Sequence, residues 1–570
     1  MRLRQALTAL GTLSLFAFAA SGCGGEMATG ADTLDPTVTP PGDSVDQADA
    51  SLASLIAAEV PGASVIVVEV TPEEMYAPQA PDDGRLRVGI SGAVDLDVDL
   101  STLRPSDLSD TPLNLGHGVI RQGLGDGFVW TGIVQTPDAT AMRVYFEGFF
   151  LPEDAELYIY SDRDEVAGPY TALGPDGDGE FWSHTLRGSE VTLQLRYTGD
   201  NAAKALADAR FVVSEIGHLD QNFLYARYGS EREYEREHCK FNEPCVMNAD
   251  CYGGSVVAAA KEAVAAILFK SGGGWYLCSG GLIADRAGSG IPYFLTANHC
   301  LSKDREASTL EAYFDFISTC GDSCNTPFYN TGTPPTTIGA SIVATGRAGD
   351  FSLLELAEDP ERPGLGWDNA DITLADGTVL YRISHPSGAT QAYSKHSVDS
   401  QYIECRSWPI GERIYSQDDI GATEGGSSGS PLLNANGEIV GQLSGGCGYN
   451  INDVCDAELN RTVDGALSFY FDQVAQWLDP TGCVPTEDPE VSCDDNIDND
   501  CDGLTDGDDP DCPCVPVDEI CDEGIDNVCD DLVDGDDPDC ACAPVGADCV
   551  YYADCCSNKC KGKPGRKTCK

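Results

Sequence analysis

The sequence predicts a mainly β protein, with an N-terminal β-sandwich, a second all-β domain of the barrel type and small disulfide-rich modules at the C-terminus. Three observations support this prediction. Apolar and polar residues alternate in segments of 55–220, short apolar runs between Gly, Pro and Asn fill 239–480, and all but one of the 25 cysteines lie from Cys239 onward. Alternation with period two predicts half-buried strands, and short strands separated by turn residues are typical of sandwiches and barrels.

Residues 1–22 have the composition of a signal peptide. Two arginines precede an apolar run from Leu10 to Ala20, which is too short for a permanent membrane-spanning helix. The following "ASGC" resembles a bacterial lipobox, in which Cys23 becomes the lipidated first residue; an ordinary signal peptide cut near Gly22 is the alternative. Removing Cys23 leaves 24 cysteines, an even number that suits a fully paired exported protein. We expect an outer-membrane or cell-surface lipoprotein, or a secreted protein.

The charge of the chain excludes two classes of partner. The formal net charge is -59, from 93 acidic and 34 basic residues. So negative a protein is not attracted to nucleic acid or to anionic lipid surfaces. We therefore expect no nucleic-acid partner, and membrane contact only through the N-terminal lipid. Residues 484–541 hold 23 of the acids and no Lys or Arg, so much of the charge lies in one segment.

The part of the chain before the cysteines divides into three segments. Residues 24–54 are rich in Ala, Asp, Pro, Thr and Gly, which predicts a disordered spacer. In 55–220, "MRVYFEGFF", "AELYIYSD" and "VTLQLRYTG" predict antiparallel strands and hence a β-sandwich. His184, beside Trp182, is assigned a structural role. The charged segment 221–238 contains several arginines and indicates a linker or a processing site.

Residues 239–480 contain the glycine- and serine-rich stretch "TEGGSSGSPLL", in which Ser428 lies between Gly426 and Gly429. A flexible linker would continue with low complexity. Instead, "PLL" and the later "GEIVGQLSGG" predict a β-hairpin, followed by a closing helix that ends near Leu478. Glycines allow a tight turn and close approach of a substrate carbonyl, so we interpret the stretch as a turn that presents Ser428 as a nucleophile.

A serine hydroxyl reacts only when a base removes its proton and a third group orients that base. "YFLTANHC" ends an apolar strand at His299, and a disulfide between Cys300 and Cys278 would clamp the loop that presents the imidazole. "AGDFSLLEL" places Asp350 directly before another apolar strand, where it can accept from the imidazole N–H. The alternatives are a structural or metal-binding His and a solvated Asp. This chemistry requires no cofactor.

These motifs resemble a known family. "TANHC", "DFSLLEL" and "GSSGSP", in the chain order His, Asp, Ser, are similar to the signatures of trypsin-like proteases of the chymotrypsin clan. With "PYFLTANHC", "GATEGGSSGSP" and "VGQLSGG", the similarity is closest to bacterial lysyl endopeptidases. It covers 239–480, and 55–220 looks like the propeptide of those enzymes. The resemblance implies a double β-barrel in which Ser428 attacks the scissile carbonyl, His299 transfers the proton and Asp350 stabilises the imidazolium.

The resemblance also implies the remaining site residues, although the sequence departs from the family at several of them. The oxyanion hole would be the backbone N–H groups of Gly426 and Ser428. Ser427 stands where digestive trypsins have an Asp that pairs with a freed N-terminus, so that activation switch is expected to be absent. Activation would instead involve removal of the 55–235 segment. The specificity pocket for a Lys or Arg side chain would contain Asp464 and Ser444, with Asp456 and Glu458 as competing acids.

Disulfides implied by the resemblance involve the remaining cysteines of this domain. Beside Cys278–Cys300, the expected pairs are Cys239–Cys455 and Cys245–Cys320. Two further pairs would come from the other four cysteines, which are Cys251, Cys324, Cys405 and Cys447.

The C-terminal region contains two acidic repeats and a basic tail. "CDDNIDNDCDGLTDGDDPDCPC" recurs 28 residues later as "CDEGIDNVCDDLVDGDDPDCAC" within 484–541. Alternating carboxylates can bind a hard cation, so we expect a possible calcium site formed by Asp498, Asp500, Asp502 and Asp506. A disulfide-stapled spacer without calcium is the alternative. Residues 542–570 resemble the inhibitor cystine knot (knottin) pattern.

The sequence therefore predicts an exported serine endopeptidase that hydrolyses proteins or peptides, with Lys or Arg before the scissile bond. One alternative is an inactive protease-fold protein that binds surfaces through its sandwich and cysteine-rich modules. Another keeps the peptidase activity and makes the knottin an inhibitory or substrate-recruiting module.

Overall fold

The computed structural model describes most of the two predicted β domains and a short hairpin near the C-terminus. All of the described residues lie between residues 52 and 569. They are 52–71, 85–123, 127–161, 163, 165–175, 177–220, 243–318, 320, 336–401, 408–480, 560–563 and 566–569. None of the helices within these ranges combines the length and the apolar character needed to cross a membrane.

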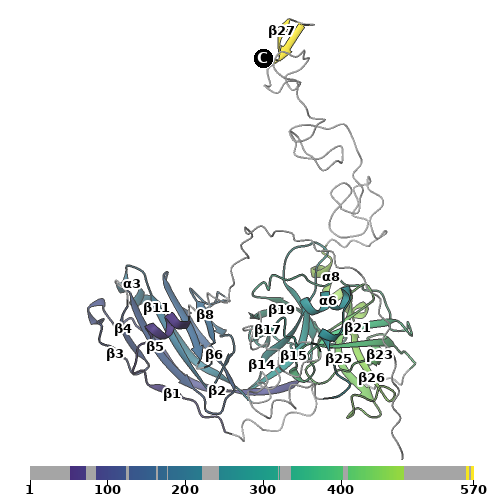
Figure 1. The fold of residues 1–570 in the computed structure, drawn as a ribbon, viewed down its shortest axis with the longest axis horizontal. Coiled ribbons are helices and arrows are strands. Elements are labelled where there is room, and N and C mark those ends of the chain that lie inside the picture. The colour runs from purple at the N-terminus through teal and green to yellow at the C-terminus, as the bar shows by residue number, and fades with distance from the viewer. Residues whose placement is uncertain are drawn as a thin grey trace, which may run out of the picture. The chain divides into compact units, whose positions relative to one another are not determined.

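The upstream domain is a sandwich of two sheets (Figure 1). In the first sheet the strands follow the order β3–β4–β5–β11–β7–β8, and β1 pairs in parallel with β5. Their bounds are β1 (Val65–Val67), β3 (Leu113–Asn114), β4 (Val119–Gln122), β5 (Phe128–Gln135), β7 (Ala155–Ser161), β8 (Val166–Tyr170) and β11 (Glu190–Tyr197). The three strands predicted from "MRVYFEGFF", "AELYIYSD" and "VTLQLRYTG" are β6, β7 and β11.

The second sheet of the sandwich begins with the order β10–β6–β12–β2, and β9 pairs with β6. These strands and the adjoining helices are β2 (Leu86–Asp99), β6 (Ala141–Phe150), β9 (Phe181–Trp182), β10 (Leu186–Arg187), β12 (Arg210–Leu219), η1 (Pro105–Asp107) and α3 (Ala202–Asp208). The core between the sheets is aromatic. Phe146 stacks on Phe181 at 5.0 Å, and Phe211 meets Trp130 edge to face at 5.7 Å.

The second sheet does not end at the sandwich but continues into the cysteine-containing domain. Strand β2 pairs with β15 (Gly274–Leu282), with Leu86 opposite Leu277 and Ile90 opposite Gly274. Side chains from both domains share one buried cluster, in which Trp182 meets Trp275 edge to face at 4.8 Å. This shared sheet is not predicted by the alternation of apolar and polar residues within either domain.

A buried polar network accompanies that contact. Arg143 is 1% exposed, and its guanidinium donates to the backbone oxygens of Ser183 and Thr309 at 2.7 Å each. It also lies 3.7 Å from the carboxylate of Glu311, which accepts from the backbone N–H of Thr185 at 3.1 Å. Because isolated charges are costly to bury, this pairing indicates a well-fitted interface.

The first barrel of the downstream domain contains β14, β15, β16, β17, β18, β19 and β20, with β16 paired to both β15 and β20. The bounds not yet given are β14 (Val264–Ser271), β16 (Tyr293–Ala297), β17 (Glu311–Tyr313), β18 (Thr336–Ile338), β19 (Ala340–Gly346), β20 (Phe351–Leu356), α6 (Ser255–Ala263) and α7 (Asp304–Ala307). Every residue of β16 is buried, as its apolar run predicts.

The second barrel closes on itself, because β22 pairs with both β21 and β23 and the path between those two runs β21–β24–β25–β26–β23. The bounds are β13 (Met247–Asn248), β21 (Val379–Ser384), β22 (Ala392–Val398), β23 (Arg413–Ile420), β24 (Pro431–Leu433), β25 (Ile439–Gly448), β26 (Asn460–Ala466), η2 (Ala249–Cys251), η3 (Pro386–Gly388) and α8 (Leu467–Leu478). Helix α8 buries Leu467, Tyr470, Val474 and Leu478, whose spacing defines one face.

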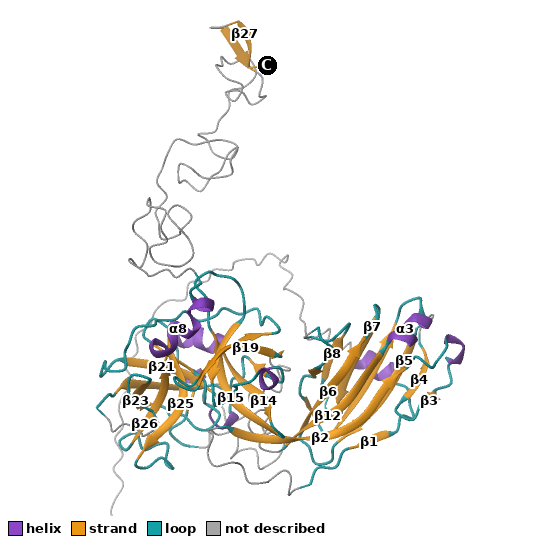
Figure 2. Cartoon of the chain, turned by 180° about the vertical axis from the view of Figure 1, so that it is seen from behind, coloured by secondary structure: helices purple, strands orange, loops and turns teal. Residues whose placement is uncertain are grey.

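Strands dominate the described elements, so the mainly β fold class is confirmed (Figure 2). The predicted hairpin after Ser428 is the β24–β25 pair, and the predicted closing helix is α8. Near the C-terminus β27 (Cys560–Lys563) pairs with β28 (Arg566–Cys569). Several predictions lie outside the described residues, namely those of a signal peptide, of lipidation at Cys23, of the spacer before residue 52, of the 221–238 linker and of the 484–541 repeats.

The disulfides correct two of the predicted pairs. Cys278–Cys300 is present as predicted. Cys455, however, is bonded to Cys245 with a Cα–Cα distance of 5.6 Å, and Cys320 is bonded to Cys251 at 4.8 Å. A cysteine forms one disulfide, so the predicted pairs Cys239–Cys455 and Cys245–Cys320 are wrong. The error is a shift by one cysteine along the chain, which only the distances between Cα atoms could prevent.

Candidate active site

Two neighbouring strands of the first barrel bring His299 and Asp350 together. Strands β16 and β20 are antiparallel, with Ala297 opposite Phe351. His299 follows the end of β16 and Asp350 precedes the start of β20, so both residues lie at the same end of the pair. The ladder continues past the strands, because the backbone N–H of Asn298 donates to the backbone oxygen of Asp350 at 3.0 Å.

The carboxylate of Asp350 holds both the backbone and the ring of His299. Its Oδ1 accepts from the backbone N–H of His299 at 3.0 Å, and its Oδ2 lies 2.8 Å from the ring Nδ1. An ionised carboxylate only accepts hydrogen bonds, so Nδ1 carries the proton and Nε2 is left as the basic nitrogen. Asp350 is 8% exposed and has a left-handed φ of 56°, a conformation that Asp tolerates better than most residues.

A glutamine of the second barrel supports the strand end that carries this acid. The side-chain Nε2 of Gln442, on β25, donates to the backbone oxygens of Gly349 and Asp350 at 2.9 Å each. Gln442 is fully buried. A barrel-to-barrel contact therefore fixes the position of the carboxylate.

Ser428 lies on a turn of the second barrel, directly before β24. Gly429 has a φ of 82°, and a Cβ atom there would lie 2.2 Å from the Thr296 hydroxyl and 2.5 Å from the backbone oxygen of Ser279. Glycine is therefore required after the serine for two reasons, backbone conformation and space. The backbone oxygen of Ser428 accepts from the N–H of Ser279 at 2.8 Å, which ties the turn to β15 of the first barrel.

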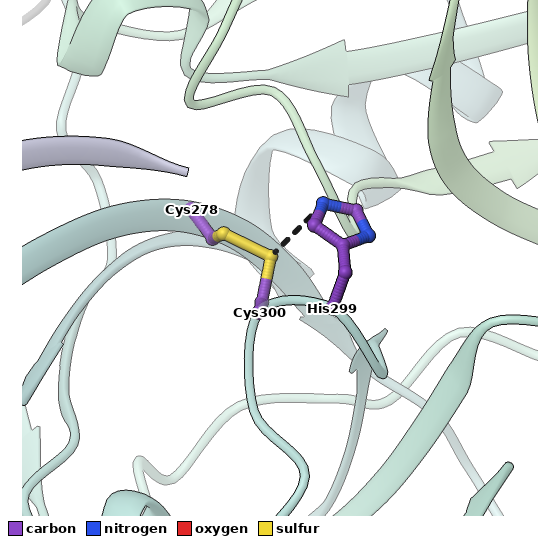
Figure 3. A group of neighbouring side chains, drawn as sticks. All are labelled: Cys278, His299 and Cys300. Carbon is purple, nitrogen blue, oxygen red and sulfur yellow. Dashed lines mark hydrogen bonds between the residues drawn. A yellow bond between two sulfur atoms is a disulfide. The ribbon is translucent and has the colours of Figure 1, made fainter. Parts of the chain in front are cut away.

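The Cys278–Cys300 disulfide lies where these two halves meet (Figure 3). The Sγ of Cys300 lies 3.7 Å from Nε2 of His299 and 3.8 Å from the backbone oxygen of Ser428. One sulfur atom is therefore close both to the imidazole and to the backbone of the serine turn. Cys278, His299 and Cys300 are close enough together to suggest a metal site, but both sulfurs are in a disulfide and so are not thiolate ligands.

The predicted pocket acid Asp464 is placed away from any surface. It is 0% exposed, and its carboxylate is paired with the equally buried guanidinium of Arg382. Because this carboxylate is buried and already paired with an arginine, we assign Asp464 to the ion pair and not to the specificity pocket. Asp464 lies at the expected number of residues after Cys455, but its position in the sequence does not reveal which side chain its carboxylate contacts.

The other predicted pocket residues lie on or after β25. Ser444 is 6% exposed, and its hydroxyl has no hydrogen-bond partner among the described residues. Asp456 is half-buried and accepts from the side chain of Asn450 at 2.8 Å, whereas Glu458 is exposed. The predicted calcium ligands Asp498, Asp500, Asp502 and Asp506 lie outside the described residues.

Sequence reasoning missed four residues that support the site, namely Ser279, Arg382, Ser387 and Gln442. Each contacts the serine turn or the Asp350 strand end from a distant part of the chain. Gln442 lies within the quoted motif "VGQLSGG", and Ser279 directly follows Cys278, but neither stretch of sequence shows what these side chains contact. For Ser387 the available signal was that "SHPSG", before Ala389, combines turn-forming residues with a histidine.

Two β-barrels, an imidazole held by a buried carboxylate, and a serine on a turn that contains glycine are features found together in serine proteases. Comparison with known proteins agrees and is more specific. Residues 240–459 match the family described as lysyl endopeptidase, C-terminal domain. The chain is also 26% identical to a lysyl endopeptidase of Pseudomonas aeruginosa over 419 residues, which are 71% of this chain and 84% of that protein. The resemblance predicted from the motifs is confirmed.

Solved structures give weaker likenesses. The active form of the Rv3671c protease from M. tuberculosis is 17% identical, covering 41% of this chain and 90% of that chain, with a TM-score of 0.26. An HtrA-type protease, AlgW with a tripeptide, is 16% identical, covering 40% of this chain and 63% of that chain, with a TM-score of 0.29. With TM-scores this low, the fold class rests on the strand pairing of the chain itself.

Proposed function

We propose that this chain is a serine endopeptidase that works through His299, Asp350 and Ser428. The observation that supports this most directly is the His299–Asp350 pair of the first barrel, which lies beside the Cys278–Cys300 disulfide, as the backbone of Ser428 also does. Substrates would be proteins or peptides, and no cofactor takes part.

The proposed reaction has two stages. Ser428 Oγ attacks the scissile carbonyl carbon while Nε2 of His299 takes the hydroxyl proton, and the carbonyl π electrons move to oxygen. When the tetrahedral intermediate collapses, the C–N bond breaks and the imidazolium gives its proton to the leaving amine. The acyl-enzyme is then hydrolysed by water through the same steps, with His299 again as base and then as acid. Asp350 stabilises the imidazolium throughout.

The first experiment measures hydrolysis of peptide amide reporters by the wild-type protein and by Ser428→Ala. Ser341→Ala, at an exposed serine of β19, is the matched control. We expect Ser428→Ala to lose activity and Ser341→Ala to keep it. Asp350→Asn should lower kcat by about 10⁴-fold, because an amide at this position favours the wrong imidazole tautomer. Equal activity in the wild type and Ser428→Ala would end the enzyme proposal in favour of a binding protein.

We further propose cleavage after Lys or Arg, on the similarity to lysyl endopeptidases. With Asp464 paired internally, Asp456 and Glu458 remain as acids for a substrate cation. A reporter panel with Lys, Arg, Phe or Ala before the scissile bond tests the preference. Asp456→Asn and Glu458→Gln then show which carboxylate carries it, as a selective rise in KM for the cationic reporters. A preference for Phe or Ala in the wild type would contradict the proposal.

We propose export from the cell, with lipidation at Cys23 and removal of the segment before the protease domain. Three disulfides among the described residues are typical of exported proteins. A mass spectrum of the native protein would reveal the mature start and any acyl group. A mature chain that begins at Met1 would contradict export by this route.

Calcium binding by Asp498, Asp500, Asp502 and Asp506 is proposed on their alternating spacing. Melting the protein with and without a chelator tests it. An unchanged melting curve would favour the spacer alternative.

A further inference from the structure

The turn that leads to the nucleophile is held by a second turn, formed by residues 384–389. The backbone N–H of Ser387 donates to the backbone oxygen of Gly425 at 2.6 Å. The Ser387 hydroxyl also donates to the carboxylate of Glu424 at 3.3 Å, and the Ser384 hydroxyl donates to that of Ser427 at 3.1 Å. The serine turn is therefore held at three of the four residues before Ser428, namely Glu424, Gly425 and Ser427.

These contacts determine where the predicted oxyanion-hole donors point. In a trans peptide the C=O and the N–H point in opposite directions. Because the oxygen of Gly425 is bound by Ser387, the N–H of Gly426 in the same peptide points away from Ser387. The oxygen of Ser427 accepts from the N–H of Ser430 at 3.1 Å, so the N–H of Ser428 likewise has a fixed direction.

Ser279 of β15 fixes the peptide between these two. Its hydroxyl donates to the backbone oxygen of Gly426 at 2.9 Å and accepts from the backbone N–H of His385 at 3.0 Å. Ser279 is fully buried, and its own N–H binds the oxygen of Ser428. One side chain thus joins the first barrel, the serine turn and the 384–389 turn.

Positive φ occurs at both ends of this arrangement, and it is strained only at Ser387, because glycine adopts it freely. Ser387 has φ 52° and ψ 23°, a left-handed conformation that costs a non-glycine residue about 1 kcal/mol or more. Gly426 has φ 98°, and a Cβ there would lie 2.9 Å from the backbone oxygen of His385. Such strain persists only where surrounding contacts enforce it, and here those contacts aim the two peptides.

The residue before the nucleophile offers no charge to an incoming amine. Ser427 is fully buried, and its hydroxyl oxygen accepts from the Ser384 hydroxyl and from the backbone N–H of Glu424. A serine side chain has no carboxylate, so residue 427 cannot form an ion pair with a freed N-terminus. The direction of the donors must therefore come from the contacts described above.

We propose that Ser279 and Ser387 are positioning residues that preform the oxyanion hole of this chain, without an ion pair to a new N-terminus. This inference rests on the proposed peptidase function. Ser279 acts through Gly426, and the left-handed backbone of Ser387 acts through Gly425. Neither side chain touches the substrate.

The test compares two inhibitors with the same peptide sequence ending in Lys. An aldehyde forms a hemiacetal with Ser428, and its oxyanion depends on the hole. A reduced-bond peptide, with CH2–NH in place of the amide, has no carbonyl and depends only on ground-state binding. For Ser279→Ala we expect kcat to fall 10- to 100-fold, with KM within about 3-fold, given that removing one oxyanion donor outright costs about 10²–10³. Aldehyde affinity should fall by the same factor, and reduced-peptide affinity should not change.

Matched variants separate positioning from folding. Ser279→Thr keeps the hydroxyl and should restore kcat. Ser416→Ala, at a buried serine of β23 whose hydroxyl has no partner among the described residues, should leave both inhibitors unaffected. Ser387→Gly keeps the N–H and tolerates the left-handed conformation, so kcat should survive, whereas the β-branched Ser387→Val should behave like Ser279→Ala. The concentration of active sites is measured by titration in each variant, and kcat is calculated from that concentration, so unfolded protein does not lower the value.

Three outcomes would overturn the inference: an unchanged kcat in Ser279→Ala, equal weakening of both inhibitors, or equal kcat in Ser387→Gly and Ser387→Val. These outcomes differ from failure of the proposed function itself. If the wild-type protein shows no amide hydrolysis that depends on Ser428, the proposed function fails. If it does and the variants keep their kcat, only the positioning inference fails.

Discussion

The buried ion pair between Arg382 and Asp464 gives the sharpest test of how this domain is built. Both side chains are 0% exposed. The other end of the Arg382 guanidinium donates to the backbone oxygen of Ser430 at 3.0 Å and to its hydroxyl at 3.1 Å, two residues beyond the nucleophile. The pair thus links β21 and β26 to the end of the serine turn. Replacing Asp464 by Asn removes the charge that compensates a buried guanidinium.

The expected cost follows from burial. Breaking a fully buried pair by removing one partner typically costs about 3–5 kcal/mol, because the remaining charge has lost its counter-charge and cannot reach water. For a cooperative unit of about 150–250 residues, each kcal/mol lowers Tm by about 2–4 °C, so Asp464→Asn should lower Tm by roughly 6–20 °C. The double variant Arg382→Met with Asp464→Leu buries no charge and should recover most of that loss.

Calorimetry on the wild type, on Asp464→Asn and on the double variant measures these changes in Tm. The Lys, Arg, Phe and Ala reporters are assayed on the same proteins, at a temperature where all are folded. We expect the ranking of reporters to be the same in Asp464→Asn as in the wild type. If Asp464→Asn kept the wild-type Tm but selectively lost activity on the Lys and Arg reporters, this reasoning would be refuted. Asp464 would then be assigned to the specificity pocket again.

Three further predictions concern stability. Burial lowers the pKa of His385 to about 4, whereas the unfolded chain takes up a proton near 6.5; the unfolded state therefore binds more protons between these values, and stability should fall by up to about 3 kcal/mol as pH drops from 6.5 to 4. Melting curves across this range should have a shallower pH slope in His385→Gln, and an equal slope would contradict the assignment. Replacing Cys278 and Cys300 by Ala opens a loop with a sequence separation of 22, which should cost about 3 kcal/mol in denaturant unfolding; no loss would show that the loop is held by other contacts. Arg143→Met leaves the buried Glu311 without its cationic neighbour and should lower the unfolding midpoint, with Arg143→Lys losing less; a midpoint at the wild-type value would mean that the hydrogen bonds from Thr185 are sufficient compensation.

Local patterns predicted the elements that carry the reactive side chains. The apolar run before His299 and the one after Asp350 became β16 and β20 because a strand is a local object. That these strands are neighbours, with Ala297 opposite Phe351, is not contained in either run. The pairing of these two strands is a contact between distant parts of the chain, which the family resemblance implies and the folded structure shows.

The errors have one origin. Asp464 was chosen by its distance along the chain from Cys455, and the disulfides of Cys455 and Cys320 were each assigned to a neighbouring cysteine. Counting residues gives a position along a strand or loop, whereas partners are set by which side of the strand a side chain takes and by distances across the fold. The positioning role of Ser279 was invisible for the same reason, since Gly426 is 147 residues away.

Backbone preference and side-chain periodicity act over a few residues, so the amino-acid sequence is enough to predict the strands and turns, a serine presented between glycines, the candidate acid Asp350 and the export of the protein. The folded chain adds that Asp350 lies 2.8 Å from the imidazole, that Asp464 is neutralised by an arginine, that Cys455 and Cys320 are bonded to other cysteines than predicted, and that the upstream sandwich shares a sheet with the first barrel. Those features depend on burial and on hydrogen bonds between residues far apart in the chain, whose free energies exist only after the strands have paired.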